Sequence, residues 1–125
     1  MRVIIRSQSE LPIYAQIREQ IREQILNGSL PEGTVLPSIR RLAQDLGVSV
    51  ITTTRAYSEL EREGCIASIQ GKGSVVLSRD NELLQEQQRK LLEEQLCGAV
   101  EAARTLGMDR RDFESLTDVF WQKTE

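Results

Sequence analysis

The side chains best suited to chemical contacts are concentrated in one short segment, SVITTTRAY at residues 49–57. It opens with Val50 and Ile51, continues through three threonines and reaches Arg55. β-branched residues lose rotamer freedom in a helix, so this run is a costly way to begin one. The methyl groups, hydroxyls and guanidinium can all contact base edges in the major groove of DNA. We therefore interpret the run as a stiff reading surface.

The residue types that most catalytic and metal sites require are missing. The chain has no histidine, and Cys65 and Cys97 lack the CxxC spacing of a zinc site or a redox pair. Gly-Lys-Gly at 71–73 is too short for a phosphate-binding loop, and no serine or cysteine triad is recognisable. The sequence thus predicts no enzyme, no cofactor and no metal. We expect both cysteines to act as small hydrophobic residues, with redox sensing as the alternative.

Charge is distributed unevenly along the 125 residues, although the formal net charge is only −3. Residues 1–80 contain 10 Lys and Arg against 9 Asp and Glu, a net of +1, whereas residues 81–125 contain 6 against 10, a net of −4. A nucleic acid would therefore bind the first part. No apolar run approaches the roughly 20 residues of a membrane span, and the N-terminus lacks the apolar core of a signal peptide. We expect a cytoplasmic protein with no membrane partner.

Three helices are predicted to position the reading surface. The first begins at about Pro12, ends at Asn27 and Gly28, and places isoleucines on one face at Ile13, Ile17, Ile21 and Ile25. Ser38 can cap the second and Gly47 ends it, with an expected buried face of Ile39, Leu42, Ala43 and Leu46. Ser49 can cap the third, with an expected buried stripe of Thr53, Ala56, Tyr57 and Leu60.

The segment after the third helix is typical of a β-hairpin. CIASIQGKGSVVL at 65–77 predicts a strand, a Gly-Lys-Gly turn and a second strand. A helix, two helices joined by the tight turn LGVS, and a hairpin together specify a winged helix-turn-helix. We therefore predict a mainly α fold with a small β-hairpin, in which residues 1–79 form the winged helix-turn-helix domain.

Residues 80–125 are predicted to form two further helices, the first ending at Gly107 and the second capped by Asp109. Two amphipathic helices joined by a short connection cannot hide both apolar faces from water. We expect them to dimerise with a second copy of the chain, because two-fold interfaces are the commonest form of self-association. Packing back onto the first domain is the alternative. The expected dimer contacts are Leu84, Leu91, Leu92, Leu96, Ala99, Val100, Ala103, Leu106, Phe113, Leu116 and Phe120.

Several motifs of the first 77 residues together resemble the DNA-binding domain of the GntR family of bacterial transcription regulators. They are LPIYAQIREQI, GSLPEGTVLPSIRRLAQDLGVS, AYSELEREGCI and GKGSVV, in the family's order and spacing. The motifs PIY and RAY, the short tail and the segment EAARTLGMDRRDFESL are similar to the YtrA subfamily. The resemblance implies dimerisation through two C-terminal helices. It also implies control of an operon that often encodes an ABC-type transporter.

The resemblance and the exposed end of the third helix define the residues expected to bind DNA. Arg40 matches the family's DNA-contacting arginine, and the hairpin turn matches its minor-groove and backbone contacts. Val50 and Thr54 stand where many family members carry arginine, so a different operator and a weaker salt dependence are expected. The expected DNA-binding residues are Arg40, Ser49, Val50, Ile51, Thr52, Thr54, Arg55, Gln70, Gly71 and Lys72.

The sequence as a whole favours a homodimeric transcription regulator, most often a repressor, that binds an inverted repeat in double-stranded DNA. A winged-helix module that binds proteins without specific DNA binding is the alternative. The identity of any small-molecule effector is unknown. Its site is expected in the helices after Leu83, with Phe120 or Trp121 lining it.

Overall fold

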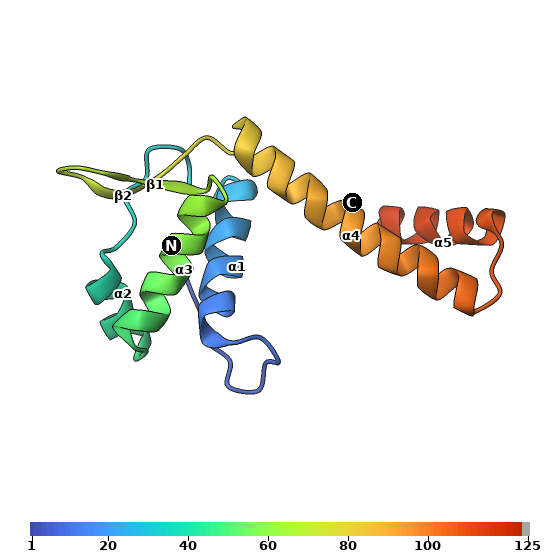
Figure 1. Cartoon of the computed structure of the whole chain (residues 1–125), viewed down its shortest axis with the longest axis horizontal. Coiled ribbons are helices and arrows are strands. Elements are labelled where there is room, and N and C mark those ends of the chain that lie inside the picture. The colour runs from blue at the N-terminus through green and yellow to red at the C-terminus, as the bar shows by residue number, and fades with distance from the viewer. Residues whose placement is uncertain (124–125) are drawn as a thin grey trace. The chain divides into compact units, whose positions relative to one another are not determined.

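The computed structural model describes residues 1–123, which form five helices and one two-stranded sheet (Figure 1). In chain order these are α1 (Ile13–Leu26), α2 (Ile39–Leu46), α3 (Val50–Arg62), β1 (Ile66–Ile69), β2 (Gly73–Val76), α4 (Glu82–Thr105) and α5 (Arg110–Lys123). The chain divides into two compact units, Met1–Gln87 and Gln88–Glu125. The predicted fold class, a winged helix-turn-helix followed by two helices, is confirmed. None of the helices within the described residues is long and apolar enough to cross a membrane.

The core of the first unit lies between α1 and α3, which pack against each other. Three of the four predicted isoleucines are buried, but Ile13 is 41% exposed because it begins the helix, one turn before the core cluster. The predicted stripe of α3 is confirmed in full, with Thr53 completely buried. Leu84, in the first turn of α4, is also completely buried in this cluster.

An N-terminal arm, residues 2–6, is attached to α1 by the side chains of three glutamines. Each amide accepts a hydrogen bond from the backbone N–H and donates one to the backbone C=O of a single arm residue, over 2.7–3.1 Å. The pairs are Gln16 with Arg6, Gln20 with Ile4, and Gln24 with Arg2. Four helical residues rise about 6.0 Å and two extended residues about 6.6 Å, so the two spacings match. This glutamine ladder was not predicted from the sequence.

The turn between α2 and α3 is fixed by backbone bonds and caps. Gly47 adopts φ 68°, a left-handed conformation that favours glycine, and it ends α2 as predicted. The N–H of Val48 donates to the carbonyl of Ala43 at 3.0 Å. Ser38 and Ser49 cap α2 and α3 by accepting from the N–H groups of Arg41 and Thr52. The start of α3 is therefore held by its own cap and by the helix before it.

The hairpin, or wing, is antiparallel and extends from the end of α3 (Figure 1). Ile66 pairs with Val76 and Ile69 with Gly73, which leaves residues 70–72 as the turn. The connector before α2 adds a third extended segment, because Val35 forms a bridge with Val75 and the N–H of Leu36 donates to the carbonyl of Ser74 at 2.8 Å. The wing is thus tied to both neighbouring segments of the domain.

The second unit is a helical hairpin formed by the later part of α4 and by α5. Gly107 follows the end of α4 with φ 77°, as predicted for the residue that stops the helix. The N–H of Met108 donates to the carbonyl of Ala103 at 3.0 Å. Asp109 caps α5 as predicted, since its carboxylate accepts from the N–H of Asp112 at 2.8 Å. Both ends of the predicted connection are therefore confirmed.

Candidate nucleic-acid and dimer interfaces

The first turn of α3 presents its β-branched side chains to solvent. Val50 is 47% exposed and Ile51 is 82% exposed, so two adjacent large aliphatic side chains face solvent. Thr54 and Arg55 are exposed in the next turn, whereas Thr53 points into the core and donates its hydroxyl to the carbonyl of Ser49 at 3.1 Å. The sorting of these residues into outward and inward sets agrees with the sequence analysis.

Thr52 lies between those two sets and is half-buried. Its hydroxyl accepts a hydrogen bond from the hydroxyl of Ser49 at 2.7 Å, and its N–H donates to the same Ser49 oxygen at 3.0 Å. The two residues therefore form a small hydroxyl pair at the N-terminus of α3. Exposed N–H groups and hydroxyls at a helix N-terminus are suited to a phosphate oxygen.

Arg55 is held by residues of two helices. Its guanidinium carbon lies 3.7 Å from the centroid of the Tyr14 ring, and its Nε donates to a carboxylate oxygen of Glu59 at 3.2 Å. The same carboxylate accepts from Arg18 at 2.6 Å and lies 3.8 Å from Arg62. Burial alone would raise the pKa of Glu59, but the hydrogen bonds and charges of Arg18 and Arg55 outweigh it, so this pKa is lowered. The carboxylate is therefore ionised at neutral pH.

The start of α2 carries the second predicted contact. Arg40 is exposed, and its side chain forms no hydrogen bond or ion pair with any other described residue. Arg41 instead pairs with Asp45 one turn later, at 3.2 Å. The hydroxyl of Tyr57 donates to the carbonyl of Pro37 at 2.7 Å, which fixes the beginning of α2 against α3. Burial raises the pKa of Tyr57 to about 12, so this donor keeps its proton at neutral pH.

The turn of the wing is open to solvent. Gln70, Gly71 and Lys72 are exposed, and Gly71 has φ 83° with no atom within 4 Å of the position that a Cβ would occupy. Only the backbone conformation, and not crowding within the chain, therefore favours glycine there. The short side chain leaves room for a close approach to another molecule.

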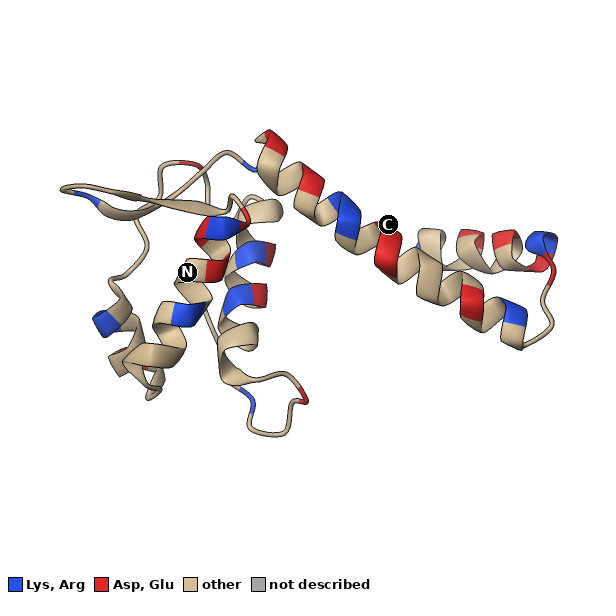
Figure 2. Ribbon diagram, in the orientation of Figure 1, with Lys and Arg blue, Asp and Glu red and all other residues tan. Residues whose placement is uncertain are grey.

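The acidic residues of α3 lie away from the end that carries these groups. Its first turn has none, and its carboxylates follow at Glu59, Glu61 and the C-cap Glu63 (Figure 2). Arg18 and Arg22 of α1 pair with Glu59 and Glu63 at 2.6 and 2.7 Å. The exposed end of α3 is thus free of negative charge, and much of the acidity at its other end is neutralised internally. The N-terminal end of α3 therefore suits a polyanion better than its C-terminal end does.

Comparison with known proteins places this geometry in a family. The model of bacterial regulatory proteins of the gntR family matches residues 13–76, which include α1, α2, α3 and both strands. The chain belongs to the GntR family. Residues 13–76 therefore form the DNA-binding domain of a bacterial regulatory protein.

Individual relatives agree with this assignment. The transcriptional repressor YtrA of Bacillus subtilis is 36% identical over 101 residues, which are 81% of this chain and 78% of the relative. A crystal structure named as a transcriptional antiterminator from Listeria monocytogenes has a TM-score of 0.77 and 32% identity, and covers 98% of this chain and 92% of its own. The predicted YtrA-like membership is confirmed. The chain is a transcription regulator and not an enzyme.

A DNA-bound relative has also been solved. The DNA-binding domain of AraR in complex with an operator has a TM-score of 0.52 and 32% identity, and covers 61% of this chain and 95% of that chain. It bears only on the winged-helix domain of the present chain. Operator binding by this family's domain is therefore established in a relative.

The second unit exposes many of the apolar residues predicted to form the dimer. Leu92, Leu96, Leu106, Leu116 and Phe120 are between 42% and 77% exposed. Ala99 is exposed, Leu91, Val100 and Phe113 are half-buried, and Ala103 is buried. The prediction that Leu84 is a dimer contact is wrong, because Leu84 is completely buried in the core of the first unit and has no surface left for a second copy.

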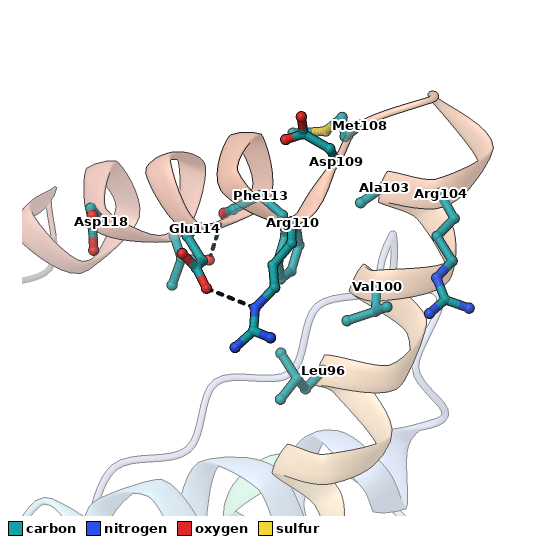
Figure 3. A pocket seen from close by; sticks show the side chains of 11 residues that line it. Leu96, Val100, Ala103, Arg104, Met108, Asp109, Arg110, Phe113, Glu114 and Asp118 are labelled. Carbon is teal, nitrogen blue, oxygen red and sulfur yellow. Dashed lines mark hydrogen bonds and ion pairs between the residues drawn. The ribbon is translucent and has the colours of Figure 1, made fainter.

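A hollow of about 710 Å³ lies within the second unit, between α4 and α5 (Figure 3). Leu96, Val100 and Ala103 line it from α4, and Phe113 lines it from α5. Arg110 crosses its side and pairs with Glu114 at 2.9 Å. Phe120 and Trp121, which were predicted to line an effector site, are not among its lining residues.

Proposed function

We propose that this GntR-family regulator is a homodimeric repressor that binds an inverted repeat in double-stranded DNA. The observation that supports this most strongly is the exposed N-terminal half of α3, with Ile51 82% exposed and no acidic residue in the first turn. The methyl group of thymine is a suitable partner for an exposed aliphatic side chain in the major groove. Family membership supports the same orientation of α3 toward the major groove.

Each winged helix would then contact one half-site. Arg40 and the hydroxyl pair of Ser49 and Thr52 supply donors for phosphates or bases at the groove, and the exposed turn at 70–72 supplies the wing contact. Val50 and Thr54 reduce the number of cationic contacts, so the base preference rests more on methyl and hydroxyl groups than on charge. Two such domains place half-sites about one helical turn apart, or a multiple of it.

The apolar residues of the second unit support a dimer through α4 and α5. Leu92, Leu96 and Leu116 are exposed in one copy, and a second copy presents the same residues in a self-complementary arrangement. The hollow beside Leu96 would be filled by the partner's side chains or narrowed by them. An effector that changes the dimer would act in this unit and alter the spacing of the reading helices.

The first test is selection of duplexes from a random DNA pool by the purified full-length protein near physiological salt. A two-fold symmetric sequence is expected, and its half-site spacing gives the distance between the two copies of α3. Light scattering on the same preparation measures the mass, which should be twice that of one 14.2 kDa chain. The DNA upstream of the protein's own gene is tested as a second probe. The proposal would be contradicted if the protein is monomeric, enriches no sequence from the pool and does not bind that upstream DNA.

Arg40→Ala separates DNA binding from the alternative of a protein-interaction module. Arg40 is exposed and makes no contact that stabilises the described fold, so the variant should keep the melting temperature and the dimer but lose DNA affinity. Arg89→Ala is the control, because Arg89 is also an exposed arginine and pairs with Glu93 on α4. Equal DNA affinity of the two variants would favour the interaction module. Control of a transporter operon rests on the subfamily resemblance and is tested by the genes nearest to the bound sites.

A further inference from the structure

Arg55 is ordered before any DNA is present. The Tyr14 ring supports one face of its guanidinium at 3.7 Å, and Glu59 accepts from its Nε at 3.2 Å. Within residues 1–123, no group accepts a hydrogen bond from either terminal nitrogen, Nη1 or Nη2. The side chain is nevertheless 61% exposed. One face of the guanidinium is therefore covered by Tyr14 and its Nε is bonded to Glu59, whereas the outer edge, formed by Nη1 and Nη2, has no acceptor among the described residues.

Arg55 lies on the same face of α3 as an exposed residue of the first turn. Arg55 follows Ile51 by four residues, so the two side chains lie on the same face of α3 one turn apart. Ile51 is the most exposed large aliphatic residue of the described chain. Arg55 is therefore on the face of α3 that carries a residue proposed to contact bases, and its terminal nitrogens have no acceptor within the described residues.

We propose that Tyr14 and Glu59 are positioning residues that hold Arg55 so that Nη1 and Nη2 donate to the O6 and N7 atoms of one guanine in each half-site. The inference rests on the proposed DNA-binding function and adds a specific base and two residues to it. Neither Tyr14 nor Glu59 was predicted as a functional residue from the sequence.

Directional base recognition explains why such restraint is useful. A free arginine side chain has many rotamers, and ordering it on binding opposes affinity. A phosphate can be approached from many directions, whereas a guanine edge requires two parallel donors in the plane of the base. A planar guanidinium held on an aromatic ring and tethered through Nε presents such a pair of donors.

The surrounding charges prevent Glu59 from repelling DNA. Arg18, Arg55 and Arg62 all lie within 4.0 Å of its carboxylate, so three cations share one anion. The guanidinium carbon of Arg18 also lies 5.7 Å from the centroid of the Tyr14 ring. Glu59 can therefore orient Arg55 without making this part of the surface negative.

Reselection from a random duplex pool with full-length variants tests the proposal. Wild-type protein should enrich a symmetric site that contains a guanine in each half. Arg55→Ala should lose the preference for that guanine by a factor between about 5 and 150, the range for a bidentate arginine–guanine pair, while the rest of the site is retained. Arg55→Lys should lose it as well, because an ammonium cannot provide two parallel donors.

Tyr14 and Glu59 are tested with conservative and disruptive substitutions. Tyr14→Phe keeps the aromatic face and should keep the guanine preference, whereas Tyr14→Leu and Glu59→Gln should weaken it. Arg62→Ala is the control, because it removes another cation near the same carboxylate from the far end of α3 and should leave the preference unchanged. Melting temperatures of all variants show whether each folds, and the Phe–Leu comparison at position 14 separates ring support from general packing.

Two results would overturn the proposal. In one, Arg55→Ala lowers affinity equally for all sequences and reduces the salt dependence, which identifies a phosphate contact. In the other, Tyr14→Leu folds and keeps the guanine preference, which makes the stacking incidental. Failure of wild-type protein to enrich any duplex would instead contradict the proposed function itself, so the two failures are distinguishable.

Discussion

The glutamine ladder can be tested with one isosteric change, Gln20→Glu. In the native protein the Gln20 amide accepts from the N–H of Ile4 at 2.9 Å and donates to the Ile4 carbonyl at 2.7 Å and to the Gln16 carbonyl at 3.2 Å. A carboxylate of the same shape can only accept. The substitution keeps the first bond, removes the other two and places a negative charge beside two carbonyl oxygens.

The expected destabilisation is modest but measurable. Each hydrogen bond contributes a net of about 0.5–1.5 kcal/mol, and solvent exposure of the arm places these bonds toward the lower value. Losing two gives about 1–2 kcal/mol at neutral pH. For a unit of the size of Met1–Gln87 this corresponds to a fall in melting temperature of roughly 4–16 °C.

Acid should reverse the effect. A protonated carboxyl can donate as well as accept, so the folded state favours the protonated form and raises the pKa of the introduced group above its unfolded value of about 4.3. A raised folded pKa means that the stabilisation from protonation is present at low pH and is lost as the pH rises through that pKa. The difference between variant and wild type should therefore be largest at neutral pH and shrink on acidification below about pH 5.

Thermal unfolding followed by circular dichroism at several pH values measures this difference. Gln8→Glu is the matched control, because Gln8 is exposed near the same arm and its side chain has no hydrogen bond within the described residues. The control should melt like wild type at each pH. A variant at position 20 that melts with wild type at pH 7, or a difference that grows in acid, would refute the role assigned to the amide.

Three further predictions concern buried groups. Tyr57→Phe removes the bond to the Pro37 carbonyl and should cost about 1–3 kcal/mol, measured by urea unfolding. Because burial raises the pKa of Tyr57 to about 12, wild type should lose stability as the pH rises from about 10, the ordinary value, toward 12, and the variant should lose less. Native Cys65 should resist alkylation until the protein unfolds, because it is completely buried and burial raises its pKa to about 12, and rapid labelling observed by mass spectrometry would contradict this. Leu84→Ala should destabilise the first unit by about 2–5 kcal/mol, and a variant with unchanged unfolding but a lost dimer would restore Leu84 to the dimer interface.

Local signals in the sequence were enough to predict the elements and their ends. Ser38, Ser49 and Asp109 are caps because a side-chain oxygen just before a helix accepts from a backbone N–H that has no partner within the helix, and all three predictions are confirmed. The inward position of Thr53 follows from helical spacing alone. These features depend on residues within one turn of each other, so tertiary structure has little opportunity to change them.

Features that depend on distant residues could not be predicted in this way. The pairs Arg18–Glu59 and Arg22–Glu63 each join residues 41 positions apart, and Tyr14 meets Arg55 only because α1 packs on α3. Leu84 is part of the apolar pattern that runs along α4, and the spacing of that pattern does not reveal that Leu84 packs into the core of the first unit. Charge and aromatic residues on an amphipathic helix permit many pairings, and packing selects one of them.

The two ends of α3 differ in how they are held, because the ion pairs with α1 are made from its C-terminal half. Arg18–Glu59 and Arg22–Glu63 form two rungs one turn apart on both helices, so sliding α3 along α1 would break both at once. All four side chains are largely buried, at 9–18% exposure, and breaking such pairs leaves uncompensated charge. These rungs fix the axial register of α3 from its C-terminal half, and the hydrogen bond from Tyr57 to Pro37 fixes α2 against it. Val50, Ile51 and Thr54 in the N-terminal half are exposed, so the packing of the helix does not rest on them. Under the proposed function, these three β-branched residues are available for contact with DNA.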